Sequence, residues 1–205
     1  IDPFFSEREQ KIKSQRLIEK VAMLALEIQE KSGEQVPIVG SFSIVGENKS
    51  EFYGMLKELT YEYAERGINI YPQWLPPIAW YFGGSVKLES MNEGIDADFI
   101  KKYQIPICMD FCHLFMGRSY HRFNLEELLE KLEPFIKHIH IADALGFDGE
   151  GVQFGEGDEG NMDVFANYVD LPYLKVIEVW QGHLDQGKGF REALIKLGKL
   201  YGKRN

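Results

Sequence analysis

The stretch Ile136-Lys-His-Ile-His-Ile-Ala-Asp143 has the pattern of a buried strand that ends in polar side chains. Two imidazoles, His138 and His140, occupy alternate positions and therefore lie on one face of the strand, and the carboxylate of Asp143 follows them. In parallel α/β folds, ligand sites form at the carboxyl ends of the strands. This stretch therefore predicts a buried parallel strand with a candidate site at its end.

Two other apolar stretches end in the same way. The run 105–111 carries Asp110 near its end and is followed by His113. The run 175–180 places Glu178 between two apolar residues. Because burying an unpaired carboxylate is very costly, we expect Glu178 to have a partner or a cation.

Helices and strands are expected to alternate along the whole chain. Strands are predicted at 36–45, 68–71, 105–111, 136–142 and 175–180, and helices at 7–32, 50–67, 96–103, 124–132, 162–169 and 188–201. Short connections and nearly continuous apolar strands predict a parallel sheet covered by helices, as either a barrel or a doubly wound sheet. Five strands are too few for a closed (β/α)8 barrel, which needs about 250 residues.

Composition narrows the classes of protein that fit. The chain has 205 residues, of which 44% are hydrophobic, and this predicts one domain over 6–205, with 1–5 interpreted as a cloning scar. The net charge of -9 argues against nucleic-acid binding. The two cysteines, Cys108 and Cys112, lie in one apolar segment and favour a reducing compartment. No apolar run is long enough to cross a bilayer, so we expect a cytoplasmic protein without a membrane partner.

Asp110, His140 and Glu178 together offer oxygen and nitrogen ligands. Carboxylates suit hard divalent ions and imidazole suits Mn, Co or Zn, so this set predicts a metal site with open positions. The alternative is a purely structural arrangement, in which Glu178 pairs with Lys137 or Arg118 and the histidines bond to the backbone.

Four ordered motifs resemble those of the xylose-isomerase-like sugar isomerase and epimerase barrels. They are Ile107-Cys-Met-Asp-Phe-Cys-His113, His138-Ile-His-Ile-Ala-Asp143, Gly155-Glu-Gly-Asp158 and Val176-Ile-Glu178. The resemblance spans about half the chain and implies an α/β fold of the (β/α)8 TIM-barrel type, incomplete, with the fourth to eighth strands present. It also implies a sugar or sugar phosphate isomerase or epimerase, in which a divalent metal (Mn, Mg, Co or Zn) assists proton transfer next to a carbonyl.

The resemblance also implies roles for single residues. The implied metal ligands are Gln73, Asp110, His140 and Glu178, and the implied catalytic residues are Glu178 and His113. His138 and Asp143 are expected to bind substrate. Trp74 and Trp80, in an aromatic loop near the expected mouth of the barrel, are expected to stack on a sugar or, alternatively, to cover an interface.

Gln73 departs from the resemblance, because the family has Glu at this position. Gln carries no charge and cannot accept a proton, so two-base epimerisation loses one of its bases. A non-catalytic sugar-binding or scaffolding barrel domain of a larger protein is therefore the competing hypothesis. DNA repair, suggested by an abasic-site endonuclease of the same superfamily, is opposed by the net charge. The expected partners are a small-molecule sugar and, at the open sheet edges, a second copy or the missing part of a parent chain.

Overall fold

The computed structural model describes residues 8–43, 48–81, 84–168 and 171–202. The N-terminal half comprises α1 (Arg8–Ser32), β1 (Ile38–Gly40), α2 (Lys49–Glu65), β2 (Ile70–Pro72), β3 (Ile78–Tyr81), β4 (Gly84–Lys87) and α3 (Gly94–Tyr103). The C-terminal half comprises β5 (Ile107–Asp110), α4 (Phe111–His121), α5 (Leu125–Leu132), a 3-10 turn (Glu133–Phe135), β6 (Ile136–Ile141), β7 (Asp143–Leu145), β8 (Gly149–Val152), α6 (Asn161–Tyr168), β9 (Leu174–Ile177) and α7 (Leu184–Gly202). The segment interpreted as a cloning scar lies outside the described residues, as do residues 44 and 45 of the first predicted strand.

Five parallel strands follow one another in chain order among the described residues. β1 pairs with β2, and β5, β6 and β9 form a second parallel sheet. A parallel bridge between Gln73 and Cys108 links β2 to β5. The order has no reversal, which favours a barrel over a doubly wound sheet. The predicted α/β fold, an incomplete TIM-type barrel, is confirmed.

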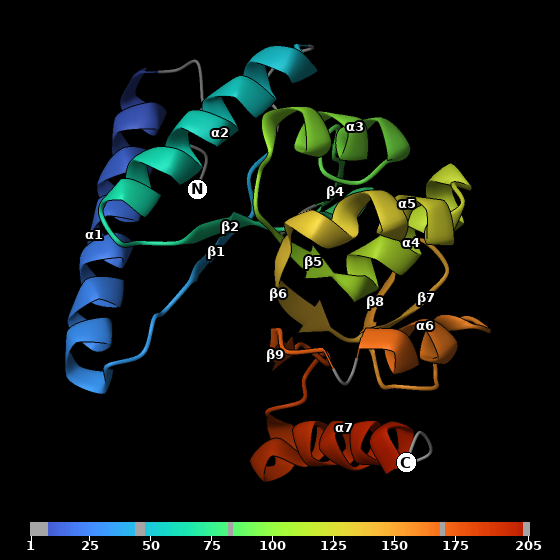
Figure 1. The fold of residues 1–205 in the computed structure, drawn as a ribbon. Coiled ribbons are helices and arrows are strands. Elements are labelled where there is room, and N and C mark those ends of the chain that lie inside the picture. The colour runs from blue at the N-terminus through green and yellow to red at the C-terminus, as the bar shows by residue number, and fades with distance from the viewer. Residues whose placement is uncertain (1–7, 44–47, 82–83, 169–170, 203–205) are drawn as a thin grey trace.

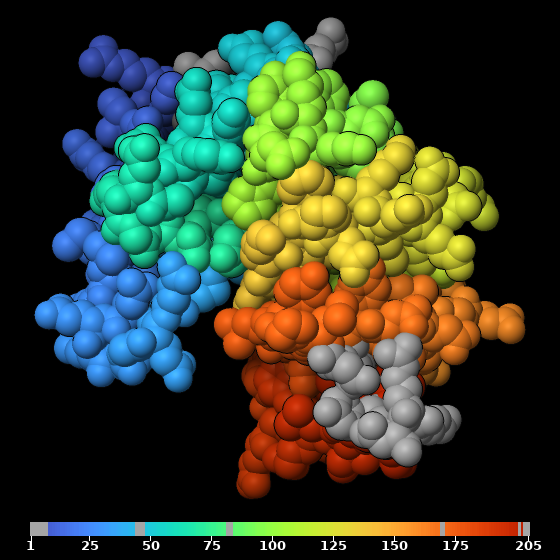
Figure 2. Space-filling view, in the orientation of Figure 1, coloured from blue at the N-terminus to red at the C-terminus, as the bar shows by residue number. Residues whose placement is uncertain are grey.

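The helices pack on the outside of these strands. Figure 1 shows α1 and α2 beside β1 and β2, α3 to α5 around β5 and β6, and α7 beyond β9. α5 illustrates why the helices form, since Leu125, Leu128, Leu129 and Leu132 are buried at helical spacing. The space-filling view shows a recess between the blue N-terminal elements and the red C-terminal helix (Figure 2).

Helix α4 was not predicted from the sequence. It begins directly after β5, without a loop, and residues 111–117 are all buried. A helical stretch buried on every side, as residues 111–117 are, shows no alternation of polar and apolar faces, so periodicity does not reveal it. Its N-cap is Asp110, whose side chain accepts a hydrogen bond from the backbone N–H of His113.

Two antiparallel hairpins, β3–β4 and β7–β8, were also missed. Each is inserted after the carboxyl end of a parallel strand, β2 and β6 respectively. They therefore border the edge of the barrel on which the candidate site lies. Both cysteines are free and buried, and none of the described helices has the length and apolar character needed to span a membrane.

Candidate metal centre

Consecutive parallel strands bring three predicted ligands to one edge. Asp110 ends β5 and is in register with His140 on β6. Glu178 directly follows β9 and continues the pairing, because its backbone N–H donates to the carbonyl of Ile141 at 3.0 Å. Asp110 and His140 are buried, whereas 45% of the Glu178 side chain is exposed. The cluster is therefore buried at Asp110 and His140 and open to solvent at Glu178, which forms its rim.

The side chains of this cluster converge. The potential ligand atoms of Asp110, His140 and Glu178 all lie within 4.8 Å of one another. The Nδ1 of His140 is 3.0 Å from Glu178 Oε2 and 3.8 Å from Asp110 Oδ2. The alternative ion pairs are not formed, because Lys137 donates to the carbonyl of Pro134 and Arg118 donates to Asn161. Glu178 has instead the imidazole as its partner.

The Gln73 side chain lies beside this cluster but presents its amide nitrogen to it. Nε2 donates to Asp110 Oδ2 at 2.8 Å and lies 3.2 Å from His140 Nδ1. The carbonyl oxygen, Oε1, accepts a hydrogen bond from Ser41 at 2.8 Å. The predicted role of Gln73 as a metal ligand would therefore require its amide to rotate and release both Ser41 and Asp110.

His113 is held between two carboxylates. Its Nδ1 is 2.9 Å from the carbonyl of Trp74 and 3.2 Å from Asp110 Oδ2, and its Nε2 is 3.1 Å from Glu150 Oε1. Burial alone would lower the pKa of His113, but Asp110 and Glu150 outweigh burial and raise it to about 9. The imidazole is therefore in its charged form at neutral pH.

Glu150 belongs to the site and was missed from the sequence. It lies on β8, the second strand of a hairpin that the sequence did not predict, so its placement beside His113 had no sequence signal. The hydrogen bond from His113 lowers the pKa of Glu150. Its side chain is 43% exposed, which puts an ionised carboxylate at the rim of the site.

The two acidic ligands differ in their electrostatic surroundings. Burial raises the pKa of Asp110, and the neighbouring charge of Glu178 adds to this effect, while His113 opposes it. Burial would also raise the pKa of Glu178, but the hydrogen bond with His140 outweighs it and the pKa is lowered. The two carboxylates lie close together, which is an arrangement that a cation stabilises.

His138 lies deeper than the carboxylate cluster. It is two residues before His140 on the same face of β6, and the two rings pack edge to face with centroids 5.1 Å apart. Burial, followed by the influence of His140, lowers the pKa of His138 to about 4. A ring that is only 3% exposed has little surface to offer a substrate.

The remaining residues predicted to contact the substrate, Asp143, Trp74 and Trp80, differ in their exposure to solvent. Asp143 is fully buried, and its oxygens accept hydrogen bonds from Ala144, Gly155, Gly157 and Asn161. A Cβ at Gly157 would lie 2.1 Å from Asp143 Oδ1, so only glycine fits there. Trp74 is fully buried as well, whereas Trp80 on β3 is 59% exposed. Asp143 therefore anchors the loop after β8, and of these residues only Trp80 keeps a surface for stacking.

Comparison with known proteins identifies the family. A family model described as the xylose isomerase-like TIM barrel matches residues 36–199. The chain belongs to this family. No curated protein matches this chain.

Three solved structures are similar to this xylose isomerase-like barrel. A D-tagatose 3-epimerase-like protein is 20% identical, with a TM-score of 0.64, over 97% of this chain and 74% of its own. The probable 3-DHS dehydratase AsbF of Bacillus anthracis is 12% identical, with a TM-score of 0.67, over 95% and 72%. The 3-keto-D-glucoside 4-epimerase YcjR of E. coli is 18% identical, with a TM-score of 0.52, over 76% and 57%. At these identities the likeness shows a shared fold.

The donor set of this barrel fits a divalent ion. Two carboxylates and one imidazole supply the mixed ligands that Mn, Co and Zn accept, and the carboxylates alone suit Mg. The ligand atoms are close enough to share one ion, and the exposed Glu178 leaves the rim open. Gln73 Nε2 donates a hydrogen bond to Asp110. An ion bound by Asp110 would replace this hydrogen bond.

Proposed function

We propose that this barrel is a metal-assisted isomerase or epimerase of a sugar or sugar phosphate, which moves a proton at the carbon next to a carbonyl. The observation that carries the proposal is the convergence of Asp110, His140 and Glu178 at the carboxyl ends of three consecutive parallel strands. Two of the three similar structures are named as an epimerase or epimerase-like protein, which supports the same class of reaction.

Asp110, His140 and Glu178 would hold the ion. When bound, a divalent ion supplies Lewis acidity, which polarises a carbonyl oxygen and stabilises the negative charge that develops as the neighbouring proton leaves. Two of the three ligands are carboxylates, which would balance the charge of a divalent ion, so the site suits a neutral sugar.

Glu178 is the proposed general base. Its lowered pKa keeps the carboxylate ionised at neutral pH, ready to accept a proton, and its half-exposed side chain can reach a molecule at the rim. Oε2 contacts His140, and the other oxygen of the carboxylate would take the proton.

His113 is the group proposed to donate a hydrogen bond to an oxygen of the substrate. Its raised pKa makes it a hydrogen-bond donor at both ring nitrogens. Because Nδ1 faces Trp74 and Asp110, Nε2 is the donor that faces the rim, where Glu150 now accepts it. A substrate oxygen would replace Glu150 as the acceptor.

Gln73 provides no base on its side of the site, which leaves Glu178 as the base. An amide cannot remove or return a proton, so a mechanism with bases on opposite faces of the carbon lacks one base. Aldose–ketose isomerisation needs only one base to carry the proton between adjacent carbons on one face. The proposal therefore favours isomerisation over two-base epimerisation.

Solvent exchange tests this proposal directly. Purified protein is loaded with Mn²⁺ and incubated in D₂O with a panel of aldoses, ketoses and their phosphates, and deuterium at the carbon next to the carbonyl is measured by NMR. We expect exchange with at least one sugar, and Glu178→Gln should reduce its rate by about 10²–10⁴-fold. The matched control is Glu130→Gln on the exposed face of α5, which should exchange like the wild type. Equal exchange in Glu178→Gln and the control, or none with any sugar, would overturn the proposal.

A non-catalytic sugar-binding or scaffolding role is the second candidate. The observation that favours it is the Gln73 amide, which satisfies Asp110 without an ion. A ligand that binds only the folded protein raises its melting temperature. An unchanged melting temperature with Mn²⁺, Co²⁺, Zn²⁺ and Mg²⁺, together with a rise on adding a sugar, would favour this candidate.

A further inference from the structure

A second group of metal-binding side chains lies one layer deeper in the barrel. Cys108 and His138 are each two residues before a proposed ligand, Asp110 and His140, and so point to the same face of the same strands. Cys108 is in register with His138 across β5 and β6. All three members of the deep group, Cys108, His138 and His140, are buried.

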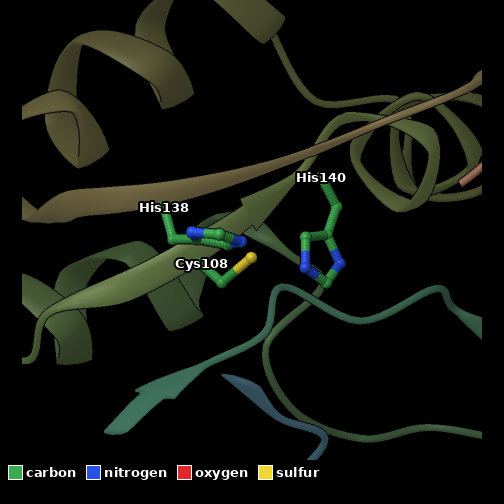
Figure 3. A group of neighbouring side chains, drawn as sticks. All are labelled: Cys108, His138 and His140. Carbon is green, nitrogen blue, oxygen red and sulfur yellow. The ribbon is translucent and has the colours of Figure 1, made fainter. Parts of the chain in front are cut away.

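The ligand atoms of the deep group face one another. The thiol sulfur and one nitrogen from each ring all lie within 4.8 Å of one another. Figure 3 shows the sulfur of Cys108 between the two imidazole rings. Of the two ring nitrogens of His138, the one farther from the backbone lies nearer the sulfur in Figure 3 and is the one placed to bind an ion.

We propose that Cys108, His138 and His140 form a second metal site, which takes a thiophilic divalent ion such as Zn²⁺. Thiolate and imidazole are the ligands that Zn²⁺ prefers, whereas Mg²⁺ and Mn²⁺ prefer the carboxylates above. On binding, the Cys108 thiol gives its proton to solvent and the sulfur bonds to the ion. The deep site rests on its own ligands and does not depend on the proposed sugar chemistry.

His140 couples the deep site to the carboxylate cluster. Its Nδ1 contacts Glu178, so the other ring nitrogen, Nε2, is the one left for Cys108 and His138. In Figure 3, one nitrogen of this ring lies on the side of the sulfur. An ion on each nitrogen would require the ring to release its N–H proton to solvent, and the two cations repel each other, so each ion should weaken the binding of the other. Zn²⁺ in the deep site would thus reduce the affinity of the upper site for Mn²⁺.

Cobalt titration tests the deep site independently of any activity. Co²⁺ bound to a thiolate shows a charge-transfer absorption band in the near ultraviolet, which carboxylate and imidazole ligands do not produce. Chelator-treated protein is titrated with Co²⁺, and then with Zn²⁺ to displace it. We expect the band at about one equivalent of Co²⁺, its removal by Zn²⁺, and its loss in Cys108→Ser and Cys108→Ala.

Two variants serve as controls. Cys112→Ser removes the other buried thiol of the described residues and should keep the band, and so should Glu178→Gln, which removes a ligand of the upper site only. Circular dichroism of the metal-free variants verifies that each is folded, and Cys108→Ala serves if Cys108→Ser does not fold. The proposal is overturned if the folded wild type shows no band, if the band survives loss of Cys108, or if Glu178→Gln abolishes it.

Discussion

The amide of Gln73 occupies a position that decides what the upper cluster can do. Its nitrogen donates to the buried Asp110 and its oxygen is held by Ser41. Asp110 is therefore paired with a neutral dipole. A carboxylate at this position would remove that hydrogen bond and place a second charge beside Asp110.

Gln73→Glu should separate stability from metal affinity. Without metal, the new carboxylate repels Asp110 at hydrogen-bond distance, and we expect a lower melting temperature than for the wild type. With Mn²⁺, the added charged ligand should give a larger rise in melting temperature than the wild type shows. Differential scanning calorimetry with and without Mn²⁺ measures both. Ser41→Ala, which removes only the anchor of the amide, is the control. An unchanged or smaller metal-induced rise in Gln73→Glu would contradict the predicted site.

His113 should make the stability of the metal-free protein depend on pH. Its pKa rises from the ordinary 6.5 to about 9 on folding, so the folded state binds the proton more tightly. The resulting stabilisation is fully present below pH 6.5 and is lost as the pH rises through 9. We expect the free energy of unfolding in urea to fall between these two values.

Glu150→Gln should reduce that fall. This variant removes one of the two carboxylates that raise the pKa of His113, so the imidazole should titrate at lower pH by NMR. Asp148→Asn, an exposed residue of the same hairpin, should leave the titration unchanged. Identical His113 titration curves in wild type and Glu150→Gln would show that the hydrogen bond is not formed in solution.

At the scale of elements, the junction of β5 and α4 gives Asp110 two roles. One oxygen caps α4 through the backbone N–H of His113, while the other faces Gln73 and His140. The same side chain therefore starts the helix and contributes to the proposed metal site. Strand and helix join without a loop, which fixes the carboxylate in place.

Two substitutions of Asp110 should separate these roles. Asn is a good N-cap, so Asp110→Asn should keep the helix but weaken metal binding. Asp110→Ala loses the cap as well and should be about 0.5–2 kcal/mol less stable than Asp110→Asn without metal. Urea unfolding measures the stability, and a competing chelator measures Mn²⁺ affinity. Equal metal affinity in wild type and Asp110→Asn would remove this residue from the proposed ligands.

Some of the helices and strands could be predicted from the sequence and others could not. The five parallel strands and the amphipathic helices were predicted because their apolar spacing is visible in the chain, as in α5. The alignment of Asp110 and His140 followed from strand ends alone. Helix α4 was hidden because its residues 111–117 are buried on every side. The β7–β8 hairpin was hidden because it carries polar residues and glycines, and the apolar strand β3 was interpreted as part of an aromatic loop. Glu150 was missed because its hairpin was not predicted. The burial of Asp143 and Trp74 depends on loop packing that no local pattern encodes.

At the scale of the whole molecule, the described sheet does not close. The first and last parallel strands, β1 and β9, each have one unpaired edge among the described residues, and the recess of Figure 2 lies between the elements that carry them. Large apolar side chains are exposed on the flanking elements, including Leu17, Met23 and Leu24 on α1 and Leu174, Leu194 and Ile195 near the C-terminus. Contact of these faces with a second copy, or with a further part of a parent chain, stays a prediction.

The central claim is that the open barrel positions Asp110, His140 and Glu178 around one divalent ion. The most direct test is anomalous X-ray diffraction from crystals soaked in Mn²⁺. We predict an anomalous peak within about 2.0–2.6 Å of an oxygen from each carboxylate and of Nδ1 of His140. Ordered side chains in their present arrangement, with no anomalous peak among them at saturating Mn²⁺, would contradict the claim.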